Sequence, residues 1–262
     1  MTGETVHGGH RERLRARYAA VGEAGLADHE LLELLLTYCI PRRDTNPLAH
    51  SLLERFGSLS GVLSADLREL CSVPGVGQST AVFLCLQRDM MKRIRLEDIG
   101  GGRGKLRLQT PLLSAKYALA MLERKPHETV LAVCLNAKRE VLSHKVMQEG
   151  SLTEAQVYPR SIAELALLSH AHSILLIHNH PSGSPLPSPA DAETTKAVRD
   201  ALQGIGIQLT DHLIVGNGVV YSFAADVLIE LTGREPATLT IPEWNAYKPA
   251  EGVSLKKVME EY

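Results

Sequence analysis

Apolar and polar residues are spaced differently in the two parts of the chain. In the first part, apolar residues recur at helical intervals between turns that contain glycine, proline or a capping residue. These patterns predict short helices at 28–40, 47–56, 64–71 and from Gln78 to about Arg93. Because helices this short cannot each bury an apolar face alone, we expect them to pack as one small bundle.

The second part alternates short apolar runs with helical patterns. The runs predict strands at 129–135, 140–148, 173–177, 207–215 and 219–223. Helices are expected at Leu112–Glu123, 161–169 and from about Pro189 to Leu202. Adjacent strands with intervening helices predict a mixed β-sheet covered by helices. The expected fold class is therefore α/β (α+β), preceded by a helical domain.

These patterns divide the chain into four segments. We expect a helical domain at 1–95, a linker at 96–109, an α/β domain at 110–233 and an extended tail at 234–262. The linker has three consecutive glycines and no apolar periodicity, which is typical of a connection between domains. The tail holds three prolines and the single tryptophan but no clear core pattern, and no role follows from it.

The composition excludes several classes of protein. The 262 residues are 44% hydrophobic and 22% charged, so the chain is neither disordered nor fibrous. A formal charge of −2 excludes a histone-like polycation, although it is compatible with a local basic patch. The sequence shows neither the apolar core of a signal peptide nor an apolar run of the about 18–20 residues that cross a membrane. Four cysteines without a C-x-x-C pair exclude a disulfide framework and a cysteine zinc finger, so we expect a cytoplasmic protein.

Histidine is unusually frequent in the second part of the chain. Seven of the eleven histidines lie between His127 and His212. The apolar segment SILLI runs directly into His178, Asn179 and His180. Successive side chains of an extended segment point to opposite sides, so both imidazoles project from one face and can reach one ion. Zinc in catalytic sites commonly binds two histidines, one carboxylate and a water molecule.

Asp191 is the candidate carboxylate. It follows the loop 181–190, in which four of ten residues are prolines that stiffen the chain. The same segment matches a helix start, with Ser188 as the N-cap, Pro189 in the first turn and an acid at the third position. Taken alone, capping is the more common role for this aspartate, and the sequence leaves both roles open.

A second H-x-H pair, His170–His172, lies at the end of an expected helix. A cationic or capping imidazole is ordinary at such a place, and no carboxylate follows in a stiff loop. We therefore do not expect a metal at this pair.

The spacing of the candidate ligands resembles a known motif. H-x-H, seven residues, serine, two residues and aspartate is the spacing of the JAMM (MPN+) metallohydrolase motif. The longer string HNHPSGSPLPSPAD, with DHLIVG from Asp211 and YSF from Tyr221, resembles the bacterial RadC family. RERLR, PRRD and VPGVG in the first part resemble the same family. The resemblance covers roughly residues 8–230, and the tail beyond about 233 departs from it.

The resemblance implies a JAMM-type domain of cytidine-deaminase-like architecture, with one zinc ion per chain bound by His178, His180 and Asp191. It also implies that Glu128, before an earlier strand, is the catalytic base. Without the resemblance, this residue would be interpreted as a solvated strand end. Ser188 would donate a hydrogen bond to the developing oxyanion. Deamination is excluded, because deaminases place glutamate where this chain has His180 and use a C-x-x-C that it lacks.

Asp211 and His212 open the next expected strand. They either orient a zinc ligand from behind or make an ordinary hydrogen bond at the strand start, and the sequence leaves both open.

The segment 73–81, VPGVGQSTA, resembles the hairpin of a helix-hairpin-helix element. Gly75 and Gly77 allow a tight turn, and N–H groups at the start of the next helix would face a DNA phosphate without reading bases. A glycine-rich turn inside a bundle explains the same residues. Basic residues outnumber acidic ones six to two in 92–107, which suits DNA but also a solvated linker. An aromatic content of 4% argues against a stacking platform for single strands.

Two functions follow from these patterns. The first is a zinc-dependent hydrolase, peptidase- or isopeptidase-like, in which a glutamate base activates water at zinc. The alternative is a DNA-associated repair or recombination protein that binds nucleic acid or hydrolyses phosphodiesters with a metal. Glu128, Ser188 and the three candidate ligands favour the hydrolase, since a binding module needs no general base. The hairpin and the basic segment favour the alternative.

Overall fold

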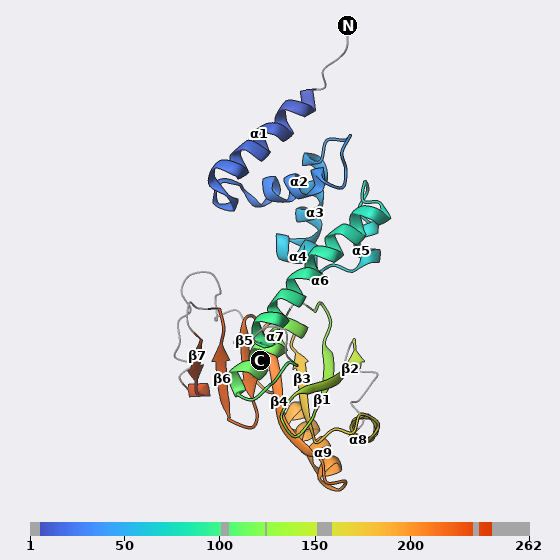
Figure 1. The fold of residues 1–262 in the computed structure, drawn as a ribbon, viewed down its shortest axis with the longest axis vertical. Coiled ribbons are helices and arrows are strands. Elements are labelled where there is room, and N and C mark those ends of the chain that lie inside the picture. The colour runs from blue at the N-terminus through green and yellow to red at the C-terminus, as the bar shows by residue number, and fades with distance from the viewer. Residues whose placement is uncertain (1–5, 101–104, 124, 151–158, 233–235, 243–262) are drawn as a thin grey trace. The chain divides into compact units, whose positions relative to one another are not determined.

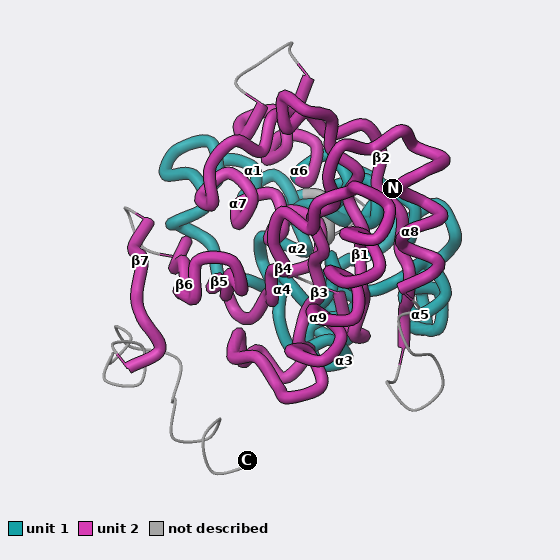
Figure 2. The backbone as a smooth tube through the Cα atoms, turned by 90° about the horizontal axis from the view of Figure 1, so that it is seen from below, with its two compact units in different colours: residues 1–91 teal, residues 92–262 magenta. Residues whose placement is uncertain are grey.

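The computed structural model describes residues 6–100, 105–123, 125–150, 159–232 and 236–242. The chain forms two compact units, residues 1–91 and residues 92–262, which Figure 2 shows in separate colours. Each unit has a hydrophobic core of its own. Within the described residues, no helix combines the length and the apolar character that a membrane crossing requires.

The first unit consists of helices. They are α1 (Val6–Val21), the short 3-10 helix η1 (Glu23–Gly25), α2 (Asp28–Thr37), α3 (Asn46–Phe56), α4 (Leu59–Ser64), α5 (Leu67–Cys71) and the first part of α6 (Gln78–Gly100). Their apolar faces meet around side chains such as Leu36, Leu52 and Leu84, which are completely buried. The helical N-terminal region expected from the sequence is therefore confirmed.

One expected helix is in fact two. The sequence predicts a helix at 64–71, whereas α4 ends at Ser64 and α5 begins after Asp66. The carboxylate of Asp66 accepts hydrogen bonds from the N–H groups of Arg68 and Glu69 at 2.7 and 2.8 Å, and the Glu69 side chain returns to the Asp66 N–H at 2.8 Å. This reciprocal cap fixes a new helix start, which explains the break.

Helix α6 is longer than the sequence predicts. It does not end near Arg93 but continues to Gly100, through the first residues of the expected linker 96–109. Leu96 and Ile99 pack against the core of the second unit. This packing gives the helix an apolar contact that its own periodicity does not reveal, so the helix persists.

The far end of the expected linker is also part of the second unit. The N–H of Leu108 donates to the carbonyl oxygen of Arg139, and the N–H of Val141 donates to the carbonyl oxygen of Leu106, both at 2.9 Å. Residues 101–104, which include most of the glycine run, lie outside the described residues.

The second unit is built on one sheet. Its strands are β1 (Thr129–Leu135), β2 (Val141–Glu149), β3 (Ser173–Asn179), β4 (Gln208–Gly216), β5 (Val219–Ser222), β6 (Val227–Glu230) and β7 (Ala237–Leu239), and its helices are α7 (Pro111–Leu122), α8 (Pro159–Leu168) and α9 (Pro189–Gln203). The strand order is β2-β1-β3-β4-β5-β6-β7, which Figure 1 shows from right to left. Only β3 and β4 pair in parallel, joined by α9, so the sheet is mixed. The expected α/β (α+β) class is confirmed.

Helices cover both faces of this sheet. Alternate residues of a strand point to opposite faces. Leu131 and Leu175 therefore pack with α7, whereas Ala132 and Leu176 pack with α8 and α9. Two residues beyond Leu176, His178 lies on the face that α8 and α9 cover. The end of β3 thus places the first candidate ligand beside α9.

The sheet continues into the expected tail. Ala237–Leu239 lie in the segment 234–262 and form β7, which pairs antiparallel with β6. Leu239 and Ile241 pack against an apolar cluster of the same unit, which explains why this part is ordered into the sheet. Residues 243–262, with the tryptophan, lie outside the described residues.

Candidate functional site

Three side chains from β3 and α9 meet at one point. Nε2 of His178 lies 2.9 Å from Nε2 of His180 and 3.1 Å from Oδ1 of Asp191, and Nε2 of His180 lies 3.5 Å from Oδ2 of Asp191. His178 is buried, and the other two side chains are partly exposed. Within the part of the chain that the structure describes, no other three His, Cys, Asp or Glu side chains converge in this way. The structure therefore brings together the three residues that the sequence spacing singled out.

Asp191 both caps the start of α9 and faces His178. Ser188 is the N-cap: its Oγ accepts a hydrogen bond from the N–H of Asp191 at 3.2 Å. In return, the N–H and the hydroxyl of Ser188 both donate to Oδ2 of Asp191 at 2.7 Å. Oδ1 remains free to face His178. Because a carboxylate has two oxygens, the capping geometry and the ligand geometry that the sequence left open are present together.

Hydrogen bonds behind His178 determine which of its ring nitrogens carries the proton. Nδ1 of His178 lies 2.8 Å from Nε2 of His212, and Nδ1 of His212 lies 2.6 Å from Oγ1 of Thr195. The Thr195 hydroxyl donates its single proton to the carbonyl oxygen of Asp191 at 2.6 Å, so it accepts from His212. His212 then accepts at Nε2, and His178 donates from Nδ1. In the neutral ring, Nε2 of His178 therefore carries a lone pair, which faces Asp191 and His180.

A single hydrogen bond orients His180 in the same way, with Nδ1 away from the centre and Nε2 toward it. Its Nδ1 lies 2.9 Å from the carbonyl oxygen of Ser184, which can only accept, so Nδ1 carries the proton and Nε2 of the neutral ring is a lone pair. Two lone pairs and the Asp191 carboxylate thus face one another at hydrogen-bond distance. This arrangement is repulsive unless a cation, a metal ion or a proton, lies between them.

The pKa values of His180 and Asp191 are also shifted in the directions that favour a positive charge beside the carboxylate. Burial acts to lower the pKa of His180, but the hydrogen bond and charge of Asp191 outweigh burial and raise it. Burial acts to raise the pKa of Asp191, but the close contacts of its carboxylate with the His178 and His180 rings favour the charged form and hold this pKa well below its usual range. Two imidazole nitrogens and one carboxylate oxygen form the donor set of catalytic zinc sites, whereas calcium and magnesium prefer oxygen ligands alone. The residues present therefore fit zinc.

Glu128 lines the same cavity. It directly precedes β1, and together with His178 and Asp191 it borders a space of about 400 Å³. Burial raises the pKa of the Glu128 carboxyl, although the nearby charges of His178 and His180 act to lower it. A carboxyl whose pKa is raised toward neutrality is suited to accept and return a proton.

Asn179, between the two histidines, holds the segment that carries Glu128. Its Oδ1 accepts from the N–H of Thr129 at 2.9 Å, and its Nδ2 donates to the carbonyl oxygens of Lys125 and His127 at 3.2 Å. The chain on both sides of Glu128 is thereby tied to β3. Sequence analysis did not single out Asn179. The signal was available, because the middle residue of an extended H-x-H must face away from the ion.

Of the pair whose role the sequence left open, His212 reaches the site and Asp211 does not. His212 is buried, and its ring stacks on Phe223 with centroids 5.0 Å apart. Asp211 accepts from the hydroxyl of Ser222 at 2.5 Å and from the N–H of Ala224 at 2.8 Å. Asp211 therefore fixes the turn after β5, while His212 supports a candidate ligand. Thr195 was also missed, although it lies one helical turn after Asp191.

The loop between β3 and α9 packs tightly on the end of β4. A Cβ atom on Gly216 would lie 2.4 Å from the carbonyl oxygen of Gly183 and 2.7 Å from the nitrogen of Pro185. Only glycine allows this approach. The contact holds the loop so that Ser184 meets His180.

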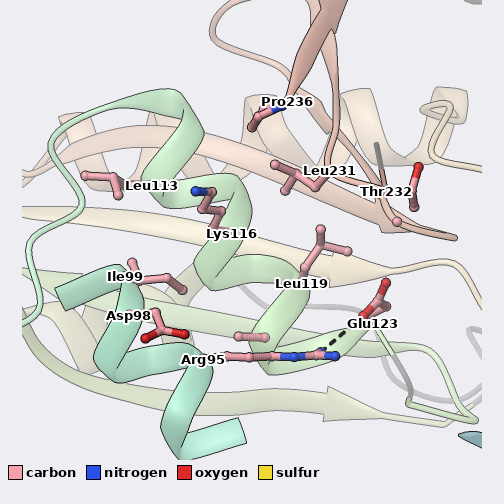
Figure 3. A pocket seen from close by; sticks show the side chains of 12 residues that line it. Arg95, Asp98, Ile99, Leu113, Lys116, Leu119, Glu123, Leu231, Thr232 and Pro236 are labelled. Carbon is pink, nitrogen blue, oxygen red and sulfur yellow. Dashed lines mark hydrogen bonds and ion pairs between the residues drawn. The ribbon is translucent and has the colours of Figure 1, made fainter. Parts of the chain in front are cut away.

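A larger cavity lies beside α7. Its volume is about 590 Å³, and Figure 3 shows it between the end of α6, α7 and the chain at Leu231. Arg95 from α6 pairs with Glu123 across it at 3.4 Å. None of the candidate ligands, nor Glu128, lines this space. The candidate functional site therefore lies at the smaller cavity.

The glycines of VPGVG lie in the turn between α5 and α6. Gly75 has φ of +94°, a conformation that favours glycine, and Gly77 directly precedes α6 with open space around it. Val73 and Val76 are buried in the core of the first unit and anchor the turn. Binding of nucleic acid at these glycines stays a prediction.

Comparison with known families defines the class of the protein. Residues 108–228 match the family described as "RadC-like JAB domain", and residues 8–82 match the family described as "UPF0758 N-terminal". The first match contains the whole candidate site. The second unit is therefore a JAB-type (MPN) domain, a class whose members are generally metal-dependent hydrolases.

Two relatives extend the match over most of the chain. A UPF0758 protein of Fusobacterium nucleatum is 34% identical over 229 residues, which are 84% of this chain and 97% of the relative. A UPF0758 protein of Ruegeria pomeroyi is 35% identical over 222 residues, which are 83% of this chain and 96% of the relative. Neither name states an activity. The chain belongs to the RadC family, as the resemblance of its motifs predicts.

Proposed function

We propose that the second unit is a zinc-dependent hydrolase that cleaves an amide bond, as a peptidase or an isopeptidase. One observation carries the proposal: two imidazole lone pairs and a carboxylate converge at one point, where His178 and Asp191 border the same cavity as Glu128. A site that only binds needs no second carboxylate whose pKa is raised. His178, His180 and Asp191 would hold the zinc ion.

Zinc, when bound, lowers the pKa of water to about 7 and polarises a carbonyl group. Glu128 accepts a proton from the attacking water and passes it to the leaving nitrogen. In this reaction the water oxygen bonds to the carbonyl carbon, the carbon–nitrogen bond breaks, and the amine leaves with the proton. Asn179 keeps Glu128 in place through the backbone of residues 125–129.

Ser188 has two roles in this proposal. In the free protein its hydroxyl donates to Asp191 and orients that carboxylate. Donation to an oxyanion requires the hydroxyl to exchange this hydrogen bond for one to the substrate. Loss of such a donor in other hydrolases costs about 2.7–4 kcal/mol of barrier.

The test is a screen of the zinc-loaded protein against peptide, isopeptide and nucleic-acid substrates, with Glu128→Gln in parallel. We expect hydrolysis of an amide substrate by the wild type and a loss of about 10²–10⁴-fold in the variant, because an amide side chain cannot accept the proton. Zinc content should be equal in both proteins. Loss of zinc from Glu128→Gln would instead make Glu128 a ligand, and equal activity in both proteins would exclude it as the base.

A second candidate function is contact with DNA phosphate at the turn between α5 and α6. The supporting observation is a positive charge beside the turn: Nη2 of Arg43 lies 3.7 Å from the position that a Cβ on Gly75 would take. The test is a salt series of DNA binding by the wild type and by Arg43→Ala. Affinity should fall with salt, and the salt slope should be smaller in the variant, because one fewer counterion is released.

A further inference from the structure

Gln148 on β2 is buried without a hydrogen-bond partner. The residue is 8% exposed, and among the described residues no group pairs with either its Oε1 or its Nε2. Buried amide groups in proteins are nearly always paired, because an unpaired one loses its bonds to water without replacement. An amide left in this state needs a partner that the described part of the chain does not supply.

The position of Gln148 indicates what that partner is. Gln148 pairs across the strands with Val130, and Val130 pairs with His178, so the three share one face of the sheet. Glu128, two residues before Val130, lies on that same face. Gln148, Glu128 and His178 all line the cavity of about 400 Å³. The unpaired amide therefore belongs to the wall of the candidate active site.

The donor and acceptor atoms of the Gln148 amide indicate which class of ligand would match it. Oε1 must accept a hydrogen bond and Nε2 must donate one, so the matching group offers both an N–H and a C=O. A peptide group does so and is uncharged. A phosphodiester offers only acceptors, would leave Oε1 unpaired, and would face the acids Glu128 and Glu193 that line the cavity.

We infer that Gln148 binds the backbone amide of a peptide-like substrate next to the bond that is cleaved. The inference rests on the proposed amide hydrolase function and names its substrate class. The free protein then bears the cost of an unpaired amide that the substrate relieves. Both amide atoms are shielded from water in the free protein, so the side chain must turn toward the cavity that it lines to reach the substrate. The hydrogen bonds then form in surroundings with little water, where they are stronger.

The test uses Gln148→Met, which keeps the length of the side chain and removes both polar atoms. The background is zinc-loaded full-length Glu128→Gln, so that binding is measured without turnover. The probe is N-acetyl-pentaalanine amide, which carries backbone amides and no reactive side chain. Gln208→Met on β4 is the matched control, since Gln208 is exposed and outside the cavity.

Two results are expected together. Gln148→Met should weaken binding of the probe about tenfold, the loss of roughly two neutral hydrogen bonds. The melting temperature of the free protein should rise, because two unpaired buried atoms are removed. If Gln148 had only a structural role, its substitution would lower both the affinity for the probe and the melting temperature. Gln208→Met should change neither.

A depsipeptide probe, in which one amide is an ester, sharpens the comparison. The ester lacks the N–H that would donate to Oε1 of Gln148. With the ester at the matching position, this probe should therefore bind the protein that retains Gln148 less tightly than the amide probe does. This difference should vanish in Gln148→Met, because the two changes remove the same bond.

The inference and the proposed function fail in different ways. Peptide cleavage by the wild type together with unchanged probe affinity in Gln148→Met would overturn the inference and leave the hydrolase. Absence of cleavage together with weaker probe binding in Gln148→Met would overturn the hydrolase and support the peptide site. Loss of affinity for an oligonucleotide, and not for the probe, would overturn the peptide class.

Discussion

The side chains of the candidate centre are oriented from behind. Ser184 fixes His180, and His212 with Thr195 fixes His178, so each ring turns a lone pair toward Asp191. These hydrogen bonds are all between 2.6 and 2.9 Å, and His212 and Thr195 are buried. Groups behind a metal ligand set both its tautomer and its direction. Residues that never contact zinc should therefore affect its affinity.

Thr195→Val tests this at one atom. The variant has nearly the same shape but cannot accept the proton from Nδ1 of His212. The tautomer of His178 that exposes Nε2 then loses its support, and we expect zinc affinity to fall about 10–100-fold. Competition with a chelator measures the affinity. Thr238→Val, at an exposed position of β7, is the control. Equal zinc affinity in both variants and the wild type would show that the hydrogen bonds from His178 to His212 and Thr195 do not contribute to zinc binding.

Spacing along the sequence predicted the candidate ligands but not the residues behind them. Alternation along a strand puts His178 and His180 on one face, which is a local pattern. Asp191 joined them through the resemblance to the JAMM spacing, since capping of the helix start is its more common role. Asn179 and Gln148 depend on what lies across the strands, and these contacts join residues about 20 to 50 positions apart. Alternation along the strand indicates that Asn179 faces away from the ion, but its partners and the neighbours of Gln148 are set by the sheet order, which the sequence alone does not give.

At the scale of elements, the site depends on where β3 ends and α9 begins. The sequence predicted a strand at 173–177, and β3 continues to Asn179, because its pairing reaches His178 on the side of β1 and Asn179 on the side of β4. The expected start of α9 at Pro189 is confirmed, since the Ser188 cap is a local signal. The end of α6 was wrong, because its last apolar residues find partners only in the folded unit.

Gly216→Ala tests the packing of the loop against β4. The added Cβ atom would lie 2.4 Å from the Gly183 carbonyl oxygen, so the loop must move. We expect a loss of about 1–3 kcal/mol in the free energy of unfolding, and weaker zinc binding because Ser184 moves from His180. Denaturant titration and chelator competition measure the two effects.

Gly204→Ala is the matched control for this loop. Its Cβ atom would lie 3.6 Å from the nearest backbone oxygen, an ordinary contact. It should leave zinc binding unchanged. If Gly216→Ala behaved like this control, close approach of the loop to β4 would not matter for the site.

At the scale of the whole molecule, all the candidate catalytic and ligand residues belong to one unit. Glu128, Ser188 and the three candidate ligands lie within residues 92–262. The helical unit contributes none of them, and it holds the turn at Gly75 that we propose as the contact for DNA phosphate. The hydrolase proposal and the DNA proposal are therefore separable by experiment.

Limited proteolysis should divide the chain into a helical fragment and a fragment that carries the candidate zinc site. The glycine-rich stretch predicts cleavage near Arg103 or Lys105, because proteases cut where small residues leave the chain accessible. We expect a C-terminal fragment that keeps its zinc, while any salt-sensitive DNA binding follows the fragment with Gly75 and Gly77. Gel filtration, metal analysis and DNA titration of the fragments check this. Salt-sensitive binding by the zinc fragment alone would exclude the turn as the contact.

The central claim, that His178, His180 and Asp191 form a zinc site, is tested most directly by the metal content of the purified protein. The wild type should contain about one equivalent of zinc per chain, and His178→Ala with His180→Ala should contain none, because a single carboxylate cannot retain the ion. The double variant His170→Ala with His172→Ala removes the other H-x-H pair and should keep the full equivalent. Full zinc in the first double variant, or loss of zinc in the second alone, would contradict the assignment.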